Sequence, residues 1–292
     1  MTLRKPLTVR RVACLTIATF AAGMIITGAL TASSAQAADA VKRIKDAGKI
    51  EVGTEAALPP LEFIKDGKIV GYGRDILGYL AKDLNVQVEQ LDLPWQGILP
   101  GLDAGKFDLV ATSVTITPTR AGKYAFTMPI AEATPYIIKR KGDTSINTVD
   151  ALIGKRVGVQ IGNASDIVAT ELDKQWKAAG KGGFAAIKRY GTNPEAYLGL
   201  ANGDADAVIH SLASLAYLIK QRPGVYELVA PVGHEKMYYA WVTRPEDANL
   251  RDYVNSVVKK MRDNGQLYKL QDEWFGFRME VPDSGYLPEG AK

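Results

Sequence analysis

The sequence has almost no cysteine and very little histidine. Of its 292 residues, only Cys14 carries a thiol, and it lies in an apolar run near the N-terminus. A chain that loses this run contains no thiol, which excludes disulfides and thiolate chemistry. Two histidines and no remaining thiol are a poor donor set for zinc, so we expect no metal site and no cofactor.

An excess of one charge is also missing once the N-terminus is set aside. The chain has 36 basic and 32 acidic residues, and four of the basic but none of the acidic residues lie in the first 37 positions. The rest of the chain is therefore balanced in charge. Such a composition gives no reason to expect binding to nucleic acid or to an anionic membrane surface.

Long apolar runs are absent except at the N-terminus. Four basic residues precede an apolar stretch over residues 12–30, and small residues follow in an A-x-A pattern that ends at Ala37. This order predicts a cleaved secretory signal over residues 1–37 and a soluble protein in the periplasm. An uncleaved N-terminal anchor is the alternative. No later run approaches the ~18 apolar residues that a membrane-spanning helix needs.

What the chain does contain is a short internal repeat. Gly-Lys at Gly48 and at Gly154 each leads into a β-branched strand, and a glycine followed by Asp108 or Asp206 leads into a second buried strand. Apolar spacing between these strands predicts helices, whose ranges are 75–84, 95–104, 166–176 and 193–203. Strands that alternate with helices predict an α/β fold with largely parallel sheets, used twice.

Polar and small residues follow each of the four predicted strands. In open α/β sheets, ligands bind beyond the carboxyl ends of the strands. If two lobes face each other, these four tips converge on one cleft. The tips are Gly53-Thr54-Glu55, Thr112-Ser113, Gly162-Asn163-Ala164-Ser165 and His210-Ser211.

Seven stretches, in this order and spacing, carry a resemblance to a known family. The sequence resembles the bacterial extracellular solute-binding proteins of the polar amino-acid class (family 3), which are the periplasmic receptors of ABC importers. The resemblance runs from about Gly48 to Phe277. Its stretches are VGTE (52–55), PPLEF (59–63), GYGRD (71–75), WQGILPGL (95–102), TITPTR (115–120), GKRVGVQ (154–160) and WFG (274–276).

The resemblance implies a two-lobed periplasmic-binding-protein fold with two hinge-crossing strands and a ligand cleft between the lobes. Lobe 1 is expected at 38–138 and 240–278, lobe 2 at 139–239, and a loosely held tail at 279–292. The crossings are expected near residues 136–141 and 237–243. The resemblance also implies a monomer whose partners are a small ligand with a carboxylate and an ABC permease in the inner membrane.

Arg120 is the residue that the resemblance assigns to the ligand's carboxylate. A guanidinium offers a planar fork of donors that matches two carboxylate oxygens. Ser113 and Thr115 are expected to supply hydroxyl donors beside it, and Pro118 to fix the turn that aims it. On the bare sequence, the alternative is a solvated arginine on a surface turn.

The tip Gly162-Asn163-Ala164 is assigned by the resemblance to the same carboxylate. It opens a predicted helix, so free backbone N–H groups are expected to favour an anion. The alternative is plain helix capping by Ser165 or Asn163, and both can hold at once.

Three residues are expected to face the rest of the ligand. Glu55 stands where the family often has an acid, which favours a cationic or amide-bearing end. Leu58 stands where relatives often have an aromatic residue, so a flat stacking contact is not expected there. Trp95 either lines the pocket or packs under its own helix.

Ser211 departs from the family pattern. Amino-acid binders normally have an aspartate here, which pairs with the α-ammonium, whereas a serine brings no charge. The sequence therefore favours a ligand whose α-amino group is substituted or missing, such as an opine, a guanidino acid or a betaine. Two alternatives stay open: Glu235 replaces the lost acid, or Ser211 only caps the next helix.

An enzyme is the competing class, since some relatives are periplasmic lyases or dehydratases. His210 beside Ser211 resembles a base and a nucleophile, but neighbours on a strand are expected to point to opposite faces. We therefore predict a binding protein of an ABC transporter and not an enzyme.

Overall fold

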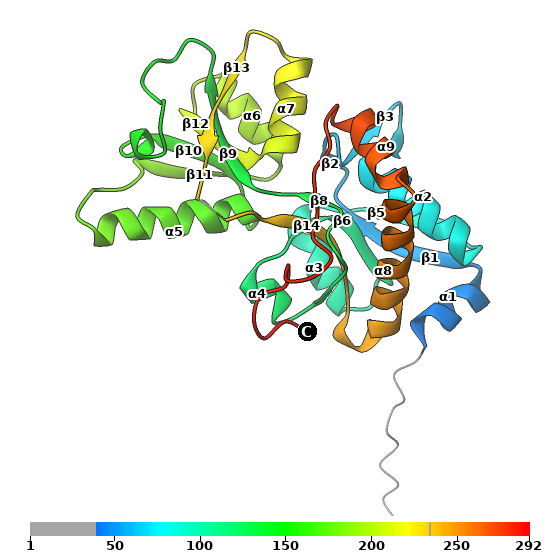
Figure 1. The fold of residues 1–292 in the computed structure, drawn as a ribbon. Helices are drawn as coiled ribbons and strands as arrows, with labels where there is room; N and C mark the ends of the chain where they lie inside the picture. The colour runs from blue at the N-terminus through cyan, green and yellow to red at the C-terminus, as the bar shows by residue number, and fades with distance from the viewer. Residues whose placement is uncertain (1–38, 234) are drawn as a thin grey trace, which may run out of the picture. The chain divides into compact units, whose positions relative to one another are not determined.

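The computed structural model describes residues 39–233 and 235–292. The predicted signal, residues 1–37, lies outside this range, so its cleavage stays a prediction. No helix within the described residues is long and apolar enough to span a lipid bilayer. The described chain forms two α/β lobes, each built on its own sheet (Figure 1).

The first sheet combines parallel strands with an antiparallel edge. Its first strand along the chain is parallel to both of its neighbours, whereas the strand that follows the second lobe runs antiparallel to the central strand. In spatial order, the strands are β5 (Gln87–Asp92), β1 (Lys49–Thr54), β6 (Leu109–Thr115), β14 (Tyr238–Thr243) and β7 (Ala125–Phe126), with β8 (Ala131–Glu132) also paired to β14.

Helices cover both faces of this sheet, so β6 is buried along its whole length. Leu109 and Ala111 pack on one face, and Val110 and Val114 pack on the other. The apolar side chains of the helix Ala248–Asp263 lie in the first of these cores. The first core takes residues from α1 (Ala40–Ala47), α2 (Tyr72–Leu84), α8 (Ala248–Asp263) and α9 (Gln266–Trp274), and the second from α3 (Trp95–Asp103) and α4 (Pro118–Ala121).

The second sheet repeats the plan. Its order is β11 (Ala186–Tyr190), β10 (Arg156–Gln160), β12 (Ala207–Ser211), β9 (Pro135–Arg140) and β13 (Tyr226–Pro231). β10 is parallel to β11 and β12, and β9 is antiparallel to β12 and β13. One face packs on α5 (Ala164–Ala178), and the other packs on α6 (Asn193–Ala201) and α7 (Leu212–Gln221).

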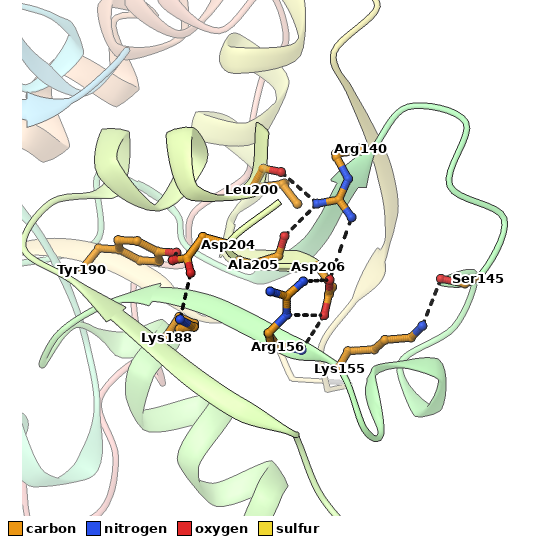
Figure 2. Close-up of polar contacts among 10 residues, drawn as sticks. All are labelled: Arg140, Ser145, Lys155, Arg156, Lys188, Tyr190, Leu200, Asp204, Ala205 and Asp206. Carbon is orange, nitrogen blue, oxygen red and sulfur yellow. Dashed lines mark hydrogen bonds and ion pairs between the residues drawn. The ribbon is translucent and has the colours of Figure 1, made fainter. Parts of the chain in front are cut away.

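The predicted internal repeat is confirmed by one aspartate in each lobe. Asp108 accepts the backbone N–H of Glu51 at 3.0 Å and pairs with Arg43. Asp206 accepts the backbone N–H of Arg156 at 2.9 Å and pairs with its guanidinium, as Figure 2 shows. Asp108, just before β6, thus ties that strand to β1. Asp206, just before β12, ties that strand to β10 in the same way.

The chain passes between the two sheets twice. It leaves the first sheet after β8 and enters the second at β9, and it returns between β13 and β14. The described residues of the crossings are therefore 133–134, 232–233 and 235–237, just before the segments expected from the sequence. A small sheet of β2 (Ala57–Leu58), β3 (Glu62–Lys65) and β4 (Lys68–Val70) belongs to the first lobe. Two short 3-10 turns, η1 (Asp150–Leu152) and η2 (Pro245–Asp247), complete the elements.

Two local features differ from expectation. The helix α6 ends at Ala201 rather than at residue 203, and Thr192 before it is its N-cap and forms a capping box with Glu195. The tail after Phe277 is not loosely held, because it brings apolar side chains back onto the first lobe. Met279 and Val281 are buried in the first core, and the final residue donates its backbone N–H to the carbonyl that ends α4.

Candidate functional site

A pocket lies at the carboxyl ends of β1, β6, β10 and β12, where residues of both lobes meet. The space between its atoms is about 480 Å³, with the open solvent at its mouth included. All the predicted site residues except Gly162 line it: Glu55, Leu58, Trp95, Ser113, Thr115, Arg120, Asn163, Ala164 and Ser211. The strand tips therefore converge as the sequence predicts.

Arg120 is held in the pocket by α4. Thr117 caps this short helix and accepts the backbone N–H of Arg120 at 3.4 Å, and Pro118 forms its first position. The guanidinium donates to the carbonyls of Thr115 at 3.1 Å and Gly162 at 3.0 Å. Burial lowers its pKa to about 10, so it stays charged at neutral pH. No ion pair joins Arg120 to any carboxylate among the described residues.

Trp95 and Leu58 close the apolar side of the pocket. The guanidinium carbon of Arg120 lies 5.0 Å from the centroid of the Trp95 ring, within the range of a cation–π contact. Trp95 also packs in the second core of the first lobe, so both predicted alternatives for this residue hold. Leu58, from β2, is buried and lines the pocket.

Glu55 reaches across the pocket to the second lobe. Its Oε1 accepts a hydrogen bond from Nε2 of Gln160 at 2.5 Å, and Gln160 in turn accepts one from Asn193 at 2.9 Å. Burial raises the pKa of Glu55 to about 7; the bond from Gln160 opposes this shift, and the charge of Asp92 adds to it. The charged and neutral forms of Glu55 are therefore both populated near neutral pH.

Ser113 donates two hydrogen bonds to a buried acid, Glu62, which the sequence did not single out as a site residue. Glu62 of β3 accepts the Ser113 hydroxyl at Oε1 (3.0 Å) and the Ser113 backbone N–H at Oε2 (3.2 Å). The side chain of Glu62 is fully buried, and burial raises its pKa to about 8. Its only sequence signal is its place in the PPLEF stretch.

The facing tip, residues 162–164, makes hydrogen bonds that differ from those expected. Asn163 caps α5 by accepting the backbone N–H of Asp166 at 3.0 Å, which confirms the capping alternative. The backbone N–H of Gly162 is not free for an anion, because it donates to the carboxylate of Asp166 at 2.9 Å. The carbonyl of Gly162, rather than its N–H, is directed to Arg120.

Ser211 and His210 both line the pocket. Ser211 is the last residue of β12 and the N-cap residue of α7. Its hydroxyl does not cap the helix but donates to the Ser214 hydroxyl at 3.4 Å. His210 Nδ1 lies 2.9 Å from the Tyr197 hydroxyl, and burial lowers the His210 pKa to about 3. Glu235, considered as a substitute acid, is exposed and lies outside this lining.

Several lining residues were missed by the sequence analysis. Gln160 and Asn193 bond to each other at the tips of the second lobe, and only the end of the GKRVGVQ stretch hinted at the first of them. The others come from the crossing segments and from β14, whose place in the pocket depends on the fold alone. They include Ala133, Pro135, Met237 and Tyr239.

Comparison with known proteins gives one consistent class. Residues 50–277 match the family model described as bacterial extracellular solute-binding proteins, family 3. The chain is 28% identical over 240 residues to the L-cystine-binding protein TcyJ of Escherichia coli (strain K12), covering 81% of this chain and 86% of that protein.

Solved structures agree in fold. A mutant of ArgBP from T. maritima is 31% identical, with a TM-score of 0.73 over 82% of this chain and 100% of that chain. The ancestral amino acid-binding protein AncCDT-1, described as a precursor of cyclohexadienyl dehydratase, is 31% identical, with a TM-score of 0.71 over 80% of this chain and 99% of that chain.

Proposed function

Because the chain belongs to family 3 of the bacterial extracellular solute-binding proteins, we propose that its pocket captures a small solute that bears a carboxylate. The protein is a substrate-binding component of an amino-acid ABC transporter and not an enzyme, since its curated relatives are binding proteins of such transporters. The alternative of a lyase or dehydratase is not favoured, because the neighbour linked to a dehydratase is itself an amino acid-binding protein.

The observation that supports a carboxylate is the state of Arg120. Its side chain is buried and charged, and no acid of the described residues neutralises it. A buried unpaired charge is costly, and a bidentate carboxylate is the partner that best matches a guanidinium. Thr115, Asn163 and Ala164 line the same pocket and complete the proposed carboxylate subsite, whereas Gly162 contributes only the carbonyl that holds Arg120.

The rest of the pocket suggests a polar amino acid or a derivative of one. Glu55 and Gln160 offer an acid and an amide to a cationic or amide-bearing end. One relative is named for L-cystine and another for L-arginine. Ser211 brings no charge to the position where the family has an aspartate, so opines and guanidino acids remain in the proposed ligand class.

Transport follows from contacts that one solute makes with both lobes. Such contacts favour the closed over the open arrangement, by an amount equal to the difference in binding free energy. We propose that the first and second lobes, whose boundaries lie before β9 and before β14 rather than at residues 138 and 239, close around the solute as a monomer. The closed protein then delivers the solute to an inner-membrane permease, after cleavage of residues 1–37 has released it into the periplasm.

A melting-temperature screen tests this function. The protein is exported with its own leader, then unfolded and refolded to remove carried-over solute. Polar amino acids, opines, guanidino acids and betaines are added to wild type, to Arg120→Ala and to the exposed-site control Arg222→Ala. A solute at about 100 times its Kd stabilises the folded state by ~2.7 kcal/mol, a shift of a few degrees.

The expected result is a carboxylate solute that shifts wild type and Arg222→Ala but not Arg120→Ala. An equal shift in Arg120→Ala shows that the carboxylate does not bind where we place it, and the proposal is then wrong.

A further inference from the structure

The acid behind Ser113 has no part in the function proposed so far. We propose that Glu62 is a positioning residue that makes the Ser113 hydroxyl a hydrogen-bond acceptor for a cationic N–H group of the solute. This inference rests on the proposed function, because it places that group in the same pocket as the carboxylate bound by Arg120.

The carboxyl of Glu62 is built into the first lobe. Both of its oxygens accept hydrogen bonds from one residue, Ser113, through the hydroxyl at 3.0 Å and the backbone N–H at 3.2 Å. A Cβ added at Gly73 would lie 1.9 Å from Oε1 of Glu62, so the glycine at the start of α2 leaves the space that the carboxyl fills. The orientation of the acid is therefore fixed by its surroundings.

The consequence for Ser113 follows from counting its protons. A serine hydroxyl has one hydrogen to donate and two lone pairs to accept with. Ionised Glu62 takes the hydrogen, while Ser113 lines the pocket and Glu62 does not. The hydroxyl thus presents a lone pair to the solute, which suits an ammonium and not a carboxylate. This reverses the donor role expected of Ser113 from the sequence.

The charge of Glu62 compensates for the missing acid at Ser211. An ammonium hydrogen-bonded to Ser113 lies one side chain away from a carboxylate, in a medium that screens charge poorly. The solute is then one in which a protonated amine accompanies the carboxylate, whether the amine is primary, as in an amino acid, or secondary, as in an opine. A betaine has no N–H for this contact and is disfavoured.

The affinity for the solute should depend on whether Glu62 is protonated. Burial raises its pKa to about 8; the bonds from Ser113 oppose this shift, and the charge of Glu55 adds to it. The other titratable groups that face Glu62 are the hydroxyls of Tyr72 and Tyr239, which burial keeps neutral at physiological pH. A solute ammonium favours the ionised acid, so binding releases a proton below about pH 8 and tightens as pH rises toward that value.

The test uses two pairs of probes that differ in a single group. L-arginine and L-glutamine are each compared with the analogue in which hydrogen replaces the α-amino group. Calorimetry gives Kd for wild type, Glu62→Gln, Ser113→Ala and the exposed acid-to-amide control Glu273→Gln, between about pH 6 and about pH 8. Circular dichroism and thermal melting confirm that each variant is folded.

In wild type and Glu273→Gln, we expect at least one amino acid to bind more tightly than its deamino analogue, by a margin that grows with pH. Glu62→Gln should weaken that amino acid by about 10- to 100-fold, the range for a hydrogen bond to a charged group, and barely affect the analogue. Ser113→Ala should do the same, and the double variant should add little, because both residues act on one group.

Three results overturn the inference: neither amino acid binds wild type, or Glu62→Gln keeps the preference for the α-amino group and its pH dependence, or it weakens all four probes equally. The proposed function is tested separately by Arg120→Ala, which should abolish binding of all four probes. If Arg120→Ala abolishes binding while Glu62→Gln matches wild type, the inference alone fails. If Arg120→Ala binds normally, the proposed carboxylate subsite is wrong.

Discussion

Glu62→Gln should change how the stability of the empty protein depends on pH. Glu62 has its pKa raised from 4.5 to about 8, mainly by burial. Between these values the folded state keeps a proton on Glu62 that the unfolded state has lost. Stability is therefore greatest below the unfolded pKa and falls as pH rises through the folded one. A glutamine cannot ionise, so the variant lacks this loss.

The size of the effect follows from the two pKa values. Each pH unit between them costs close to 1.4 kcal/mol, so wild type should lose about 2.5 kcal/mol relative to Glu62→Gln between about pH 5.5 and about pH 7.5. For a chain of this size, that corresponds to ~5–10 °C in melting temperature. Urea unfolding of wild type, Glu62→Gln and Glu273→Gln across this range measures the difference directly.

The comparison between variants removes most other contributions. Glu55, whose pKa is also raised, titrates in all three proteins and largely cancels in the differences. We expect the free-energy difference between Glu62→Gln and wild type to slope upward with pH, and Glu273→Gln to run parallel to wild type. If Glu62→Gln also runs parallel to wild type, Glu62 is ionised in the folded protein at all these pH values, and the reasoning from its burial is refuted.

Three further predictions follow from the packing. Gly53→Ala places a Cβ 2.4 Å from a buried phenylalanine ring and should cost ~1–3 kcal/mol, whereas Gly97→Ala, with no atom within 4 Å, should be neutral or stabilising; equal melting temperatures would contradict this. Asp206→Asn should cost about 1 kcal/mol in urea unfolding, an effect that shrinks in high salt if charge is responsible. Tyr217→Ala removes a ring whose centroid lies 6.0 Å from that of Phe63 in the other lobe. The affinity for the solute, measured by calorimetry, should fall ~2- to 10-fold, with little change in the melting temperature of the empty protein. An unchanged affinity would show that this contact does not favour closure.

The general plan of the fold could be predicted because it depends on local signals. Glycines at strand entries, helical spacing of apolar residues and polar strand ends each act over a few residues, and together they indicate an α/β chain with converging tips. Arg120 was placed in the pocket by the family resemblance, since the bare sequence left a solvated arginine open, but the turn that holds it is local. Pro118 and Thr117, beside it in the sequence, hold the short helix that presents it.

The remaining features depend on contacts between distant segments, which no local pattern encodes. Glu62 lies on a short strand where an acid would ordinarily be solvated, and only the packing of β6 and α2 around it makes it a buried acid. The bonds of Ser211 to Ser214 and of His210 to Tyr197 likewise join segments that the strand pattern alone does not connect.

The two crossings also determine the order in which the protein can be completed. The second sheet uses one continuous stretch, from β9 to β13, so all its partners are present once that stretch has emerged. The first sheet must wait, because Thr115 pairs with Tyr239 and the core needs α8 and α9. Pairing between such distant segments is slow and leaves strand edges exposed meanwhile. An exported chain of this design stays incompletely folded until nearly all of it has been synthesised, which favours passage through a translocation channel as an extended polypeptide.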